Sequence, residues 1–368
     1  MSEAAQHLAK LIELEGPIPI STFMQIALAH PKHGYYPAHA AIGVDGDFIT
    51  APEVSQLFGE LVGVWVLQSW LDLEQPLDWQ LIELGPGRGT LMSDILRTLK
   101  LRPWSLDGVQ LHLVETSKPL RATQRETLGP MAMGALWHEN IDSIPSGPAI
   151  LVANEFFDAL PIRQFIKLKG IWNERRVTLD ETSSERDPPF RFVAEPTLFD
   201  VEHEVPLART AANGEVVELS SQSRSIAATI GKRLASERGR ALIIDYGYAQ
   251  ERHGDTLQAL SKHTKLDPLE RIGQTDVTAH VDFASIGVAA EHEGARAYGP
   301  ITQREFLSAL GIRARLAALS KAASPAQRQR LERGAERLTS PGEMGDLFRV
   351  LVLSSPQLPA PPAFEGAR

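Results

Sequence analysis

Apolar residues in the first part of the chain recur with the spacing of helices. Leu8 and Ile12, for example, share one helical face. The run from Thr50 to Glu53 has the Thr-x-x-Glu spacing of a capping box with an early proline, which predicts one long helix that ends near Leu73. We therefore interpret residues 1–78 as an N-terminal helical region that also supplies a lid.

From Trp79 onward, short apolar runs alternate with helical patterns. Strands that alternate with helices usually build a parallel sheet, so this order predicts an α/β fold with a Rossmann-like core and a mostly parallel, doubly wound sheet. Within residues 79–160 the expected strands are Gln80–Leu84, Gln110–Glu115 and Ala149–Ala153, separated by helices at Thr90–Lys100 and Pro119–Leu128.

The later part of the chain interrupts this alternation and then resumes it. A hairpin that turns at Lys169-Gly170 predicts an inserted β element, whereas a helix from Ser221 and a strand at Ala241–Ile244 return to the core pattern. The expected segments are the β insertion at 161–215, the core continuation at 216–250, a loop-rich insertion near the active site at 251–300, the C-terminal part of the core at 301–355, and a disordered, proline-rich tail at 356–368.

Composition excludes several classes of protein. A net charge of −9 argues against nucleic-acid binding, which needs a basic surface. The absence of cysteine excludes disulfides, thiolate metal sites and cysteine nucleophiles. The most apolar stretch, 57–73, carries Glu60 and Asp72 and is too short and too charged to span a membrane. The first residues resemble neither a signal nor a transit peptide, so we expect a cytoplasmic protein.

The sharpest local motif is a glycine-rich loop, Glu83-Leu84-Gly85-Pro86-Gly87-Arg88-Gly89-Thr90, between an expected strand and an expected helix. In α/β folds, ligands bind beyond the carboxyl ends of the strands. Gly85, Gly87 and Gly89 permit a tight turn and a close approach of the backbone to a ligand. The amides that open the next helix favour an anionic group. The loop therefore predicts a cofactor site.

Acidic residues around this loop indicate which cofactor it binds. Glu83 suits the ammonium group of S-adenosylmethionine, and Glu115 at the next strand end can accept hydrogen bonds from both ribose hydroxyls. The Glu-x-Gly-x-Gly-x-Gly spacing also differs from the Gly-x-Gly-x-x-Gly of dinucleotide enzymes. We expect S-adenosyl-L-methionine as the donor and S-adenosyl-L-homocysteine as the product. Asp142, on the adenine side, and Asn154 complete the expected cofactor-binding set.

Longer segments carry a family resemblance. Together with Glu83–Thr90, the segments Gly46–Glu53, Asn154–Pro161 and Asp276–Phe283 resemble the mitochondrial dysfunction protein A family. The resemblance covers about residues 5–355. It implies a class I methyltransferase core with S-adenosylmethionine as donor and, for the mitochondrial member, symmetric dimethylation of an arginine in a respiratory complex I subunit.

An arginine acceptor needs carboxylates, because they can bind a guanidinium group as a fork and take up the proton as the methyl group arrives. Glu155 and Asp158 follow the third expected strand and are the residues we expect to hold the acceptor. The alternative is a structural role, in which one of them caps the following turn or pairs with Arg163.

His280 with Asp282 is a second catalytic candidate, since a carboxylate can orient an imidazole for general-base work; a hydrogen-bonded loop histidine is the alternative. Tyr35 and Tyr36 are expected to line the acceptor entrance, and Asp47 to lie in the lid. Ordinary packing explains the two tyrosines equally well. We expect no metal, because the histidines and acids near residue 280 lack ligand spacing.

The leading hypothesis is a protein-arginine N-methyltransferase that acts on a protein substrate, such as a respiratory complex I subunit. The alternatives are a different methyl acceptor, an inactive assembly factor that keeps the fold, and an NAD-dependent oxidoreductase, which the glycine spacing disfavours. The two insertions offer surface for a partner or for a homodimer.

Overall fold

The computed structural model describes residues 1–38, 50–180, 190–249, 253–261 and 264–365. The chain forms two compact units, each assembled from separate stretches. Unit 1 comprises Met1–Phe48, Asp158–Ser223 and Gln250–His280, and unit 2 comprises Ile49–Phe157, Arg224–Ala249 and Val281–Arg368.

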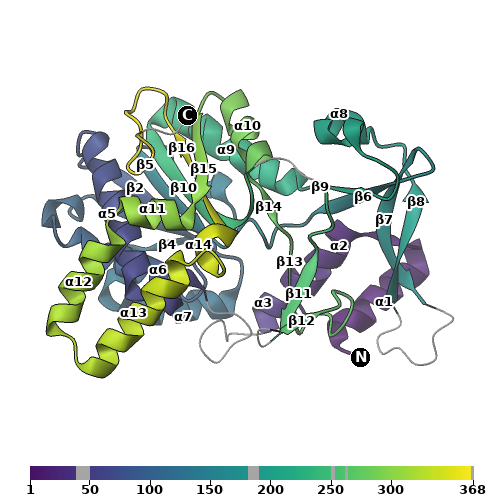
Figure 1. Cartoon of the computed structure of the whole chain (residues 1–368), viewed down its shortest axis with the longest axis horizontal. Coiled ribbons are helices and arrows are strands. Elements are labelled where there is room, and N and C mark those ends of the chain that lie inside the picture. Colours follow the sequence, from purple (N-terminus) through teal and green to yellow (C-terminus); the bar gives the residue numbers. More distant parts are fainter. Residues whose placement is uncertain (39–49, 181–189, 250–252, 262–263, 366–368) are drawn as a thin grey trace. The chain divides into compact units, whose positions relative to one another are not determined.

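Unit 2 is built on an eight-stranded sheet with the order β15-β16-β10-β5-β2-β3-β4, to which the short β14 adds beside β10 (Figure 1). Strands β10, β5, β2, β3 and β4 are parallel, and β16 is antiparallel to both of its neighbours, which confirms the expected mostly parallel sheet. The strands are β2 Trp79–Leu84, β3 Val109–Val114, β4 Leu136–His138, β5 Ala149–Asn154, β10 Gly239–Tyr248, β14 Val281–Asp282, β15 Arg296–Thr302 and β16 Phe348–Ser354.

Helices cover this sheet and share one apolar core with it. The helix α5 packs closely on α6, because Gly59 and Gly63 leave room for the side chains of Asp94 and Thr98. The helices of unit 2 are α4 Ala51–Val54, α5 Gln56–Asp72, α6 Thr90–Leu99, α7 Lys118–Leu128, α10 Phe283–His292, α11 Gln303–Ala309, α12 Ile312–Ala322, α13 Pro325–Thr339 and α14 Met344–Leu347, with short turns η2 Pro103–Ser105, η3 Gly129–Gly134 and η4 Ile141–Ser143. The helix α9, Ser221–Glu237, begins in unit 1 and continues into unit 2.

Unit 1 has its own core between helices and a second sheet, in the order β1-β7-β6-β9 with β8 beside β7. A three-stranded sheet, β12-β11-β13, also belongs to it. Its elements are α1 Glu3–Glu15, β1 Ile18–Pro19, α2 Ile20–Met24, the π-helical turn η1 Gln25–Ala29, α3 Tyr35–Ala38, β6 Arg163–Leu168, β7 Ile171–Leu179, β8 Phe190–Pro196, α8 Val201–Glu204, η5 Pro206–Thr210, β9 Val216–Leu219, β11 Gln258–Ser261, β12 Thr264–Leu266 and β13 Asp276–Thr278.

The structure differs from the sequence-based expectations in three places. The long helix expected from Thr50 is split, because extended backbone at Ser55 separates α4 from α5 and Thr50 makes no side-chain cap. The region 251–300 contains β11 to β15 and α10 rather than mainly loops. The expected disordered tail packs through residue 365, and Leu358 and Phe364 are buried in the core of unit 2.

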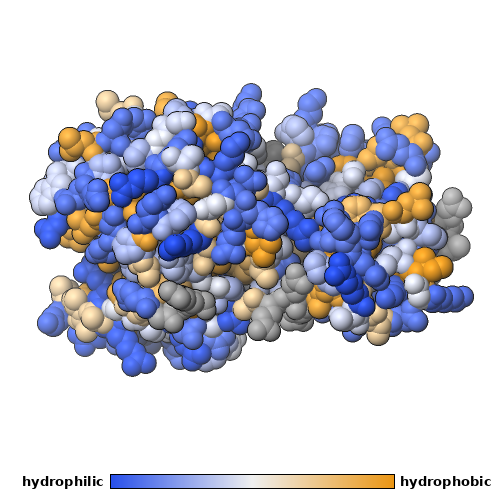
Figure 2. Space-filling view, turned by 90° about the horizontal axis from the view of Figure 1, so that it is seen from above, coloured by the Kyte–Doolittle hydropathy of each residue, from blue (hydrophilic) through white to orange (hydrophobic). Residues whose placement is uncertain are grey.

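Apolar and polar side chains are interspersed on the face that Figure 2 shows. Exposed apolar residues such as Leu14, Met133 and Leu198 are ordinary on a protein surface. Within the described ranges, no helix combines the length and the apolar character that crossing a membrane requires.

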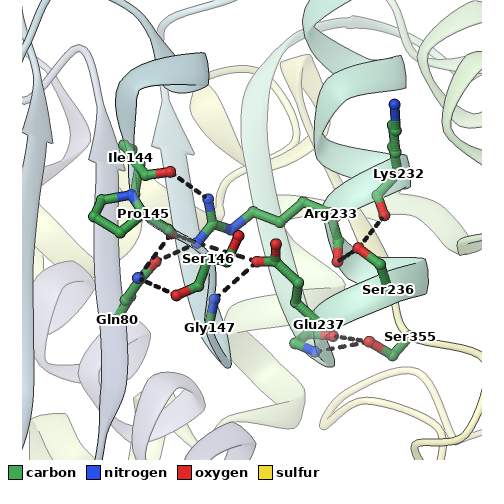
Figure 3. Close-up of polar contacts among 11 residues, drawn as sticks. Gln80, Ile144, Pro145, Ser146, Gly147, Lys232, Arg233, Ser236, Glu237 and Ser355 are labelled. Atoms are coloured by element: carbon green, nitrogen blue, oxygen red, sulfur yellow. Dashed lines mark hydrogen bonds and ion pairs between the residues drawn. The ribbon is translucent and has the colours of Figure 1, made fainter.

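A polar network holds the amino ends of β2 and β5, opposite the strand ends where ligands bind (Figure 3). Arg233 on α9 donates to the side-chain oxygen of Gln80 and to the carbonyls of Ile144 and Pro145. Its partner Glu237 lies 3.3 Å away and also accepts a hydrogen bond from the Gly147 amide. A single guanidinium therefore links a covering helix to two neighbouring strands.

Replacing Arg233 by Leu should lower the free energy of unfolding by about 2–4 kcal/mol, since several buried acceptors and a carboxylate would lose their donor. Urea unfolding measures the change. Arg330, exposed on α13, provides the matched control, and its replacement by Leu should change stability by less than about 0.5 kcal/mol. Equal effects at both positions would contradict the structural role of the network.

Candidate functional site

The glycine-rich loop lies between the carboxyl end of β2 and the start of α6. Sheet order reverses at β2, since β3 and β4 follow on one side and β5 and β10 on the other, so the loop occupies the position where α/β sheets bind ligands. Gly85, Gly87 and Gly89 all have positive φ angles, of 61°, 52° and 83°. Side chains rarely adopt this left-handed conformation, so the loop requires glycine on backbone grounds alone.

The glycines differ in what surrounds them. A Cβ atom at Gly85 would lie 2.8 Å from Cδ2 of Phe156, so this glycine allows close packing. A Cβ atom at Gly87 would meet no described atom within 4 Å and would point into open space. Gly87 therefore has open space beside it, which a cofactor-binding loop requires.

Glu83, near the end of β2, is a carboxylic acid in an unusual environment. Its side chain is 2% exposed, and Oε2 has no hydrogen-bond partner among the described residues. Burial raises its pKa to about 8. A buried carboxyl of this kind gains a counter-charge when a cationic ligand binds beside it, which fits the ammonium group of S-adenosylmethionine.

Glu115 follows β3 and is held by the backbone on both sides. Its Oε1 accepts a hydrogen bond from the Ser117 amide at 2.7 Å, and its own amide donates to the carbonyl of His138 on β4. Burial raises the pKa of this carboxyl, and its hydrogen bonds oppose that effect. The carboxylate is thus fixed at the strand end where ribose hydroxyls were expected.

Gln124 on α7 connects the glycine-rich loop with Glu115, although it was not among the residues expected at this site. Its Nε2 donates to the carbonyl of Gly87 at 2.8 Å and to Oε2 of Glu115 at 3.2 Å, and its Oε1 accepts from Nε1 of Trp137 at 2.8 Å. The side chain is fully buried. A sequence signal existed, because position 124 lies four residues from Leu120 and from Leu128 on the apolar side of the helix.

The segment after β5 is organised by Asp245 at the carboxyl end of β10. Oδ2 of Asp245 accepts hydrogen bonds from the amides of Phe156 and Phe157 at 3.1 and 2.9 Å. Glu155 has a φ of 51°, and its Oε1 accepts from the Ala51 amide, at the first residue of α4, at 3.0 Å and from Nδ2 of Asn154 at 3.2 Å. Glu155 thus holds the amino end of a helix, a structural contact different from the expected cap of the following turn.

The other expected site residues divide between the units. Unit 2 holds the glycine loop, Glu83, Glu115, Asn154, Glu155, Asp142 and Asp282, whereas unit 1 holds Tyr35, Tyr36, Asp158 and His280. Asp142 is exposed on η4, and Asp47 lies outside the described residues.

The structure gives partners for Arg163, His280 and Asp282. Arg163 pairs with Glu174 at 2.7 Å. The amide of His280 donates to Oγ1 of Thr256, and Oδ1 of Asp282 accepts from the Ser285 amide at the start of α10. Asp282 is therefore a helix cap. Among the described residues no cluster of histidine and acidic side chains could hold a metal ion.

Comparison with known proteins identifies the family. A model for S-adenosyl-L-methionine-dependent methyltransferases matches residues 61–301, more than half of the chain. The chain belongs to this methyltransferase family. The family resemblance found in the sequence is confirmed, and S-adenosylmethionine is the methyl donor.

Similar proteins extend across almost the entire chain. The protein arginine methyltransferase NDUFAF7, mitochondrial, is 36% identical in Danio rerio, over 94% of this chain and 85% of the relative, and 34% identical in Homo sapiens, over 95% and 82%. A crystal structure of a Burkholderia thailandensis protein bound to S-adenosyl-homocysteine has a TM-score of 0.84 and 31% identity, and the match covers 99% of this chain and 95% of that one.

These relatives correct one expectation. Cytoplasmic localisation is wrong by this comparison, because the relatives from fish, fly and human are all named mitochondrial proteins. The lack of a recognisable leader pattern among the first residues is weak evidence about a compartment.

Replacing Gly87 by Val should weaken S-adenosylhomocysteine binding at least tenfold, because the side chain would enter the open space beside the loop. Isothermal titration calorimetry measures this change. Gly129 is the matched control, since its φ is 54° and a Cβ there also meets nothing within 4 Å. Gly129→Val therefore imposes similar backbone strain. Equal loss of affinity in both variants would contradict the ligand-facing position of Gly87.

Replacing Glu83 by Gln should stabilise the ligand-free protein while weakening cofactor binding. The folded-state pKa of about 8 lies above the ordinary value of 4.5, so the folded protein retains a proton that the unfolded chain loses. Wild-type stability must fall as the pH rises from 4.5 to 8. The Gln variant lacks this loss and should be more stable by about 1–3 kcal/mol at pH 8, with little difference at pH 4.5.

Thermal unfolding at both pH values, with calorimetric titration of S-adenosylhomocysteine, measures the two effects. A variant that is less stable at pH 8, or one that binds as tightly as the wild type, would show that Glu83 does not have this role.

Proposed function

We propose that this methyltransferase is a protein-arginine N-methyltransferase. The observation that carries the proposal is the near full-length similarity to relatives named protein arginine methyltransferases, together with the match to the model for S-adenosylmethionine-dependent methyltransferases. A respiratory complex I subunit is the first acceptor to test, on the basis of the family resemblance.

In the proposed arrangement the cofactor follows the strand ends of unit 2. Glu83 binds the methionine ammonium group, and the amides at the start of α6 bind its carboxylate. Glu115 accepts hydrogen bonds from the ribose hydroxyls, while Asp142 on η4 and Asn154 border the adenine and methyl sides. Gln124 keeps the loop and Glu115 at a fixed separation, because one amide group donates to both.

When bound, S-adenosylmethionine supplies an electrophilic methyl group for an in-line displacement by a guanidinium nitrogen. The protein's task is to orient that nitrogen, to stabilise the cationic group and to accept the departing proton. Asp158 and Glu155 remain the proposed carboxylates, with His280 as an alternative proton acceptor. Glu155 would act through Oε2 in this role, because its Oε1 accepts hydrogen bonds from the Ala51 amide of α4 and from the side chain of Asn154.

Transfer of a labelled methyl group tests the proposal. The purified protein is incubated with S-adenosylmethionine carrying a heavy methyl group and a lysate depleted of small molecules, and mass spectrometry then maps the label. Label on arginine that disappears with Gly87→Val and persists with Gly129→Val is the expected result. Label confined to another type of residue, or to small molecules added back, would overturn the arginine assignment and leave the methyltransferase family unaffected.

A further inference from the structure

A polar cluster in unit 1 joins segments that are distant in the sequence. The hydroxyl of Tyr36 donates to Oδ1 of Asp276 on β13 at 3.2 Å. The ring of Tyr35 meets that of Tyr36 edge-on, with centroids 5.5 Å apart. An aromatic pair thus stands beside a carboxylate, although Asp276 was not among the expected site residues.

A second carboxylate belongs to the same cluster. Asp158 is 6% exposed, and its carbonyl accepts a hydrogen bond from the Ala279 amide at 3.0 Å, directly after β13. Burial, followed by the nearby charges of Asp276 and Asp158, raises the pKa of the Tyr36 hydroxyl well above its usual value. Both carboxylates therefore lie within electrostatic range of one protonated hydroxyl.

Thr278 adds an observation that is independent of the acidic pair. Its side chain is 2% exposed, and Oγ1 has no hydrogen-bond partner among the described residues. Side chains two positions apart on a strand point to the same face. Thr278 consequently shares the face of β13 on which Asp276 meets Tyr36. Buried hydroxyls without a partner are rare, and each calls for an explanation such as a bound water, ion or ligand.

We propose that Tyr36, Asp158, Asp276 and Thr278 form a binding site for a guanidinium side chain of the protein acceptor. A guanidinium group has five N–H donors in a planar fork, which suits two carboxylates and a hydroxyl, and its flat face can stack on an aromatic ring. This inference rests on the proposed arginine methyltransferase activity and assigns the cluster to acceptor recognition.

Binding of a small probe tests the site directly. Acetyl-arginine amide is titrated into the full-length protein in the presence of S-adenosylhomocysteine, with acetyl-citrulline amide as the neutral probe of the same shape, and saturation-transfer NMR reports binding. We expect the arginine probe to bind and the citrulline probe to bind at least tenfold more weakly. Equal binding of the two probes, or no binding of the arginine probe, would overturn the inference.

Variants then locate the binding. Asp276→Asn should weaken the arginine probe about tenfold through loss of a charge-assisted hydrogen bond. Glu270→Gln is the matched control, because it removes the same charge from an exposed position of unit 1 and should leave binding unchanged. Equal effects of the two substitutions would indicate a general effect of charge and would contradict the assignment.

Thr278→Val distinguishes a ligand-binding hydroxyl from a merely buried one. The substitution preserves shape and removes the hydroxyl that lacks a partner, so the variant should fold at least as well as the wild type. Weaker binding of the arginine probe with undiminished thermal stability supports the site, whereas unchanged binding removes Thr278 from it. S-adenosylhomocysteine affinity confirms in each variant that unit 2 is folded.

Failure of this inference can be told apart from failure of the proposed function. If mass spectrometry finds labelled arginine and Asp276→Asn changes neither probe binding nor the extent of labelling, the methyltransferase assignment stands and this site does not. If the cluster binds the arginine probe but the label is found on another residue type, the site stands and the arginine acceptor is wrong.

Discussion

The candidate cofactor site of unit 2 depends on one buried carboxyl group, that of Glu83, which lies just before the glycine-rich loop. Glu83 lies on β2, an interior strand of the mostly parallel sheet, and one of its oxygens lacks a partner among the described residues. Such a group costs stability whenever it is ionised, and the pKa of about 8 reflects that cost. A ligand with a positive charge would stabilise the ionised form of Glu83. The unfavourable burial of this carboxyl group in the ligand-free protein would therefore favour binding of a cationic ligand.

At Gln124, one side chain connects several elements of the candidate site. The glycine-rich loop follows β2 and Glu115 follows β3, so the two lie on separate elements. The buried side-chain amide of Gln124 donates hydrogen bonds to both of them. Trp137 in turn fixes the orientation of that amide from β4. The short edge strand β4 therefore contributes to the site, although none of its residues was expected to touch a ligand. Asp245 has a comparable role on the other side of β2, because its Oδ2 accepts hydrogen bonds from the backbone amides of Phe156 and Phe157.

Local patterns in the sequence predicted the parts of the site that depend on local geometry. The strand at 80–84, the glycine loop and the next helix follow from adjacent residues, so β2, the positive φ angles and α6 agree with expectation. Contacts between distant residues could not be predicted in this way. The bond from the Ala51 amide to Glu155 spans 104 positions, and that from Tyr36 to Asp276 spans 240. The break at Ser55 was missed because the Thr-x-x-Glu pattern at Thr50 indicates where a helix can begin and does not show where that helix ends. The packed tail was missed because its prolines suggest disorder, whereas Leu358 and Phe364 complete the core.

The division of each unit into three separate stretches has a consequence for how this protein can be altered. The chain passes from one unit to the other five times, at 48/49, 157/158, 223/224, 249/250 and 280/281. Strands β5 and β10 are neighbours in the sheet, yet the residues that join them first run through unit 1. Neither unit can therefore be obtained as a fragment by a single cut, and no single crossover between relatives would exchange one unit whole and leave the other intact. Exchange of one whole unit between relatives would require a crossover at each of these five boundaries.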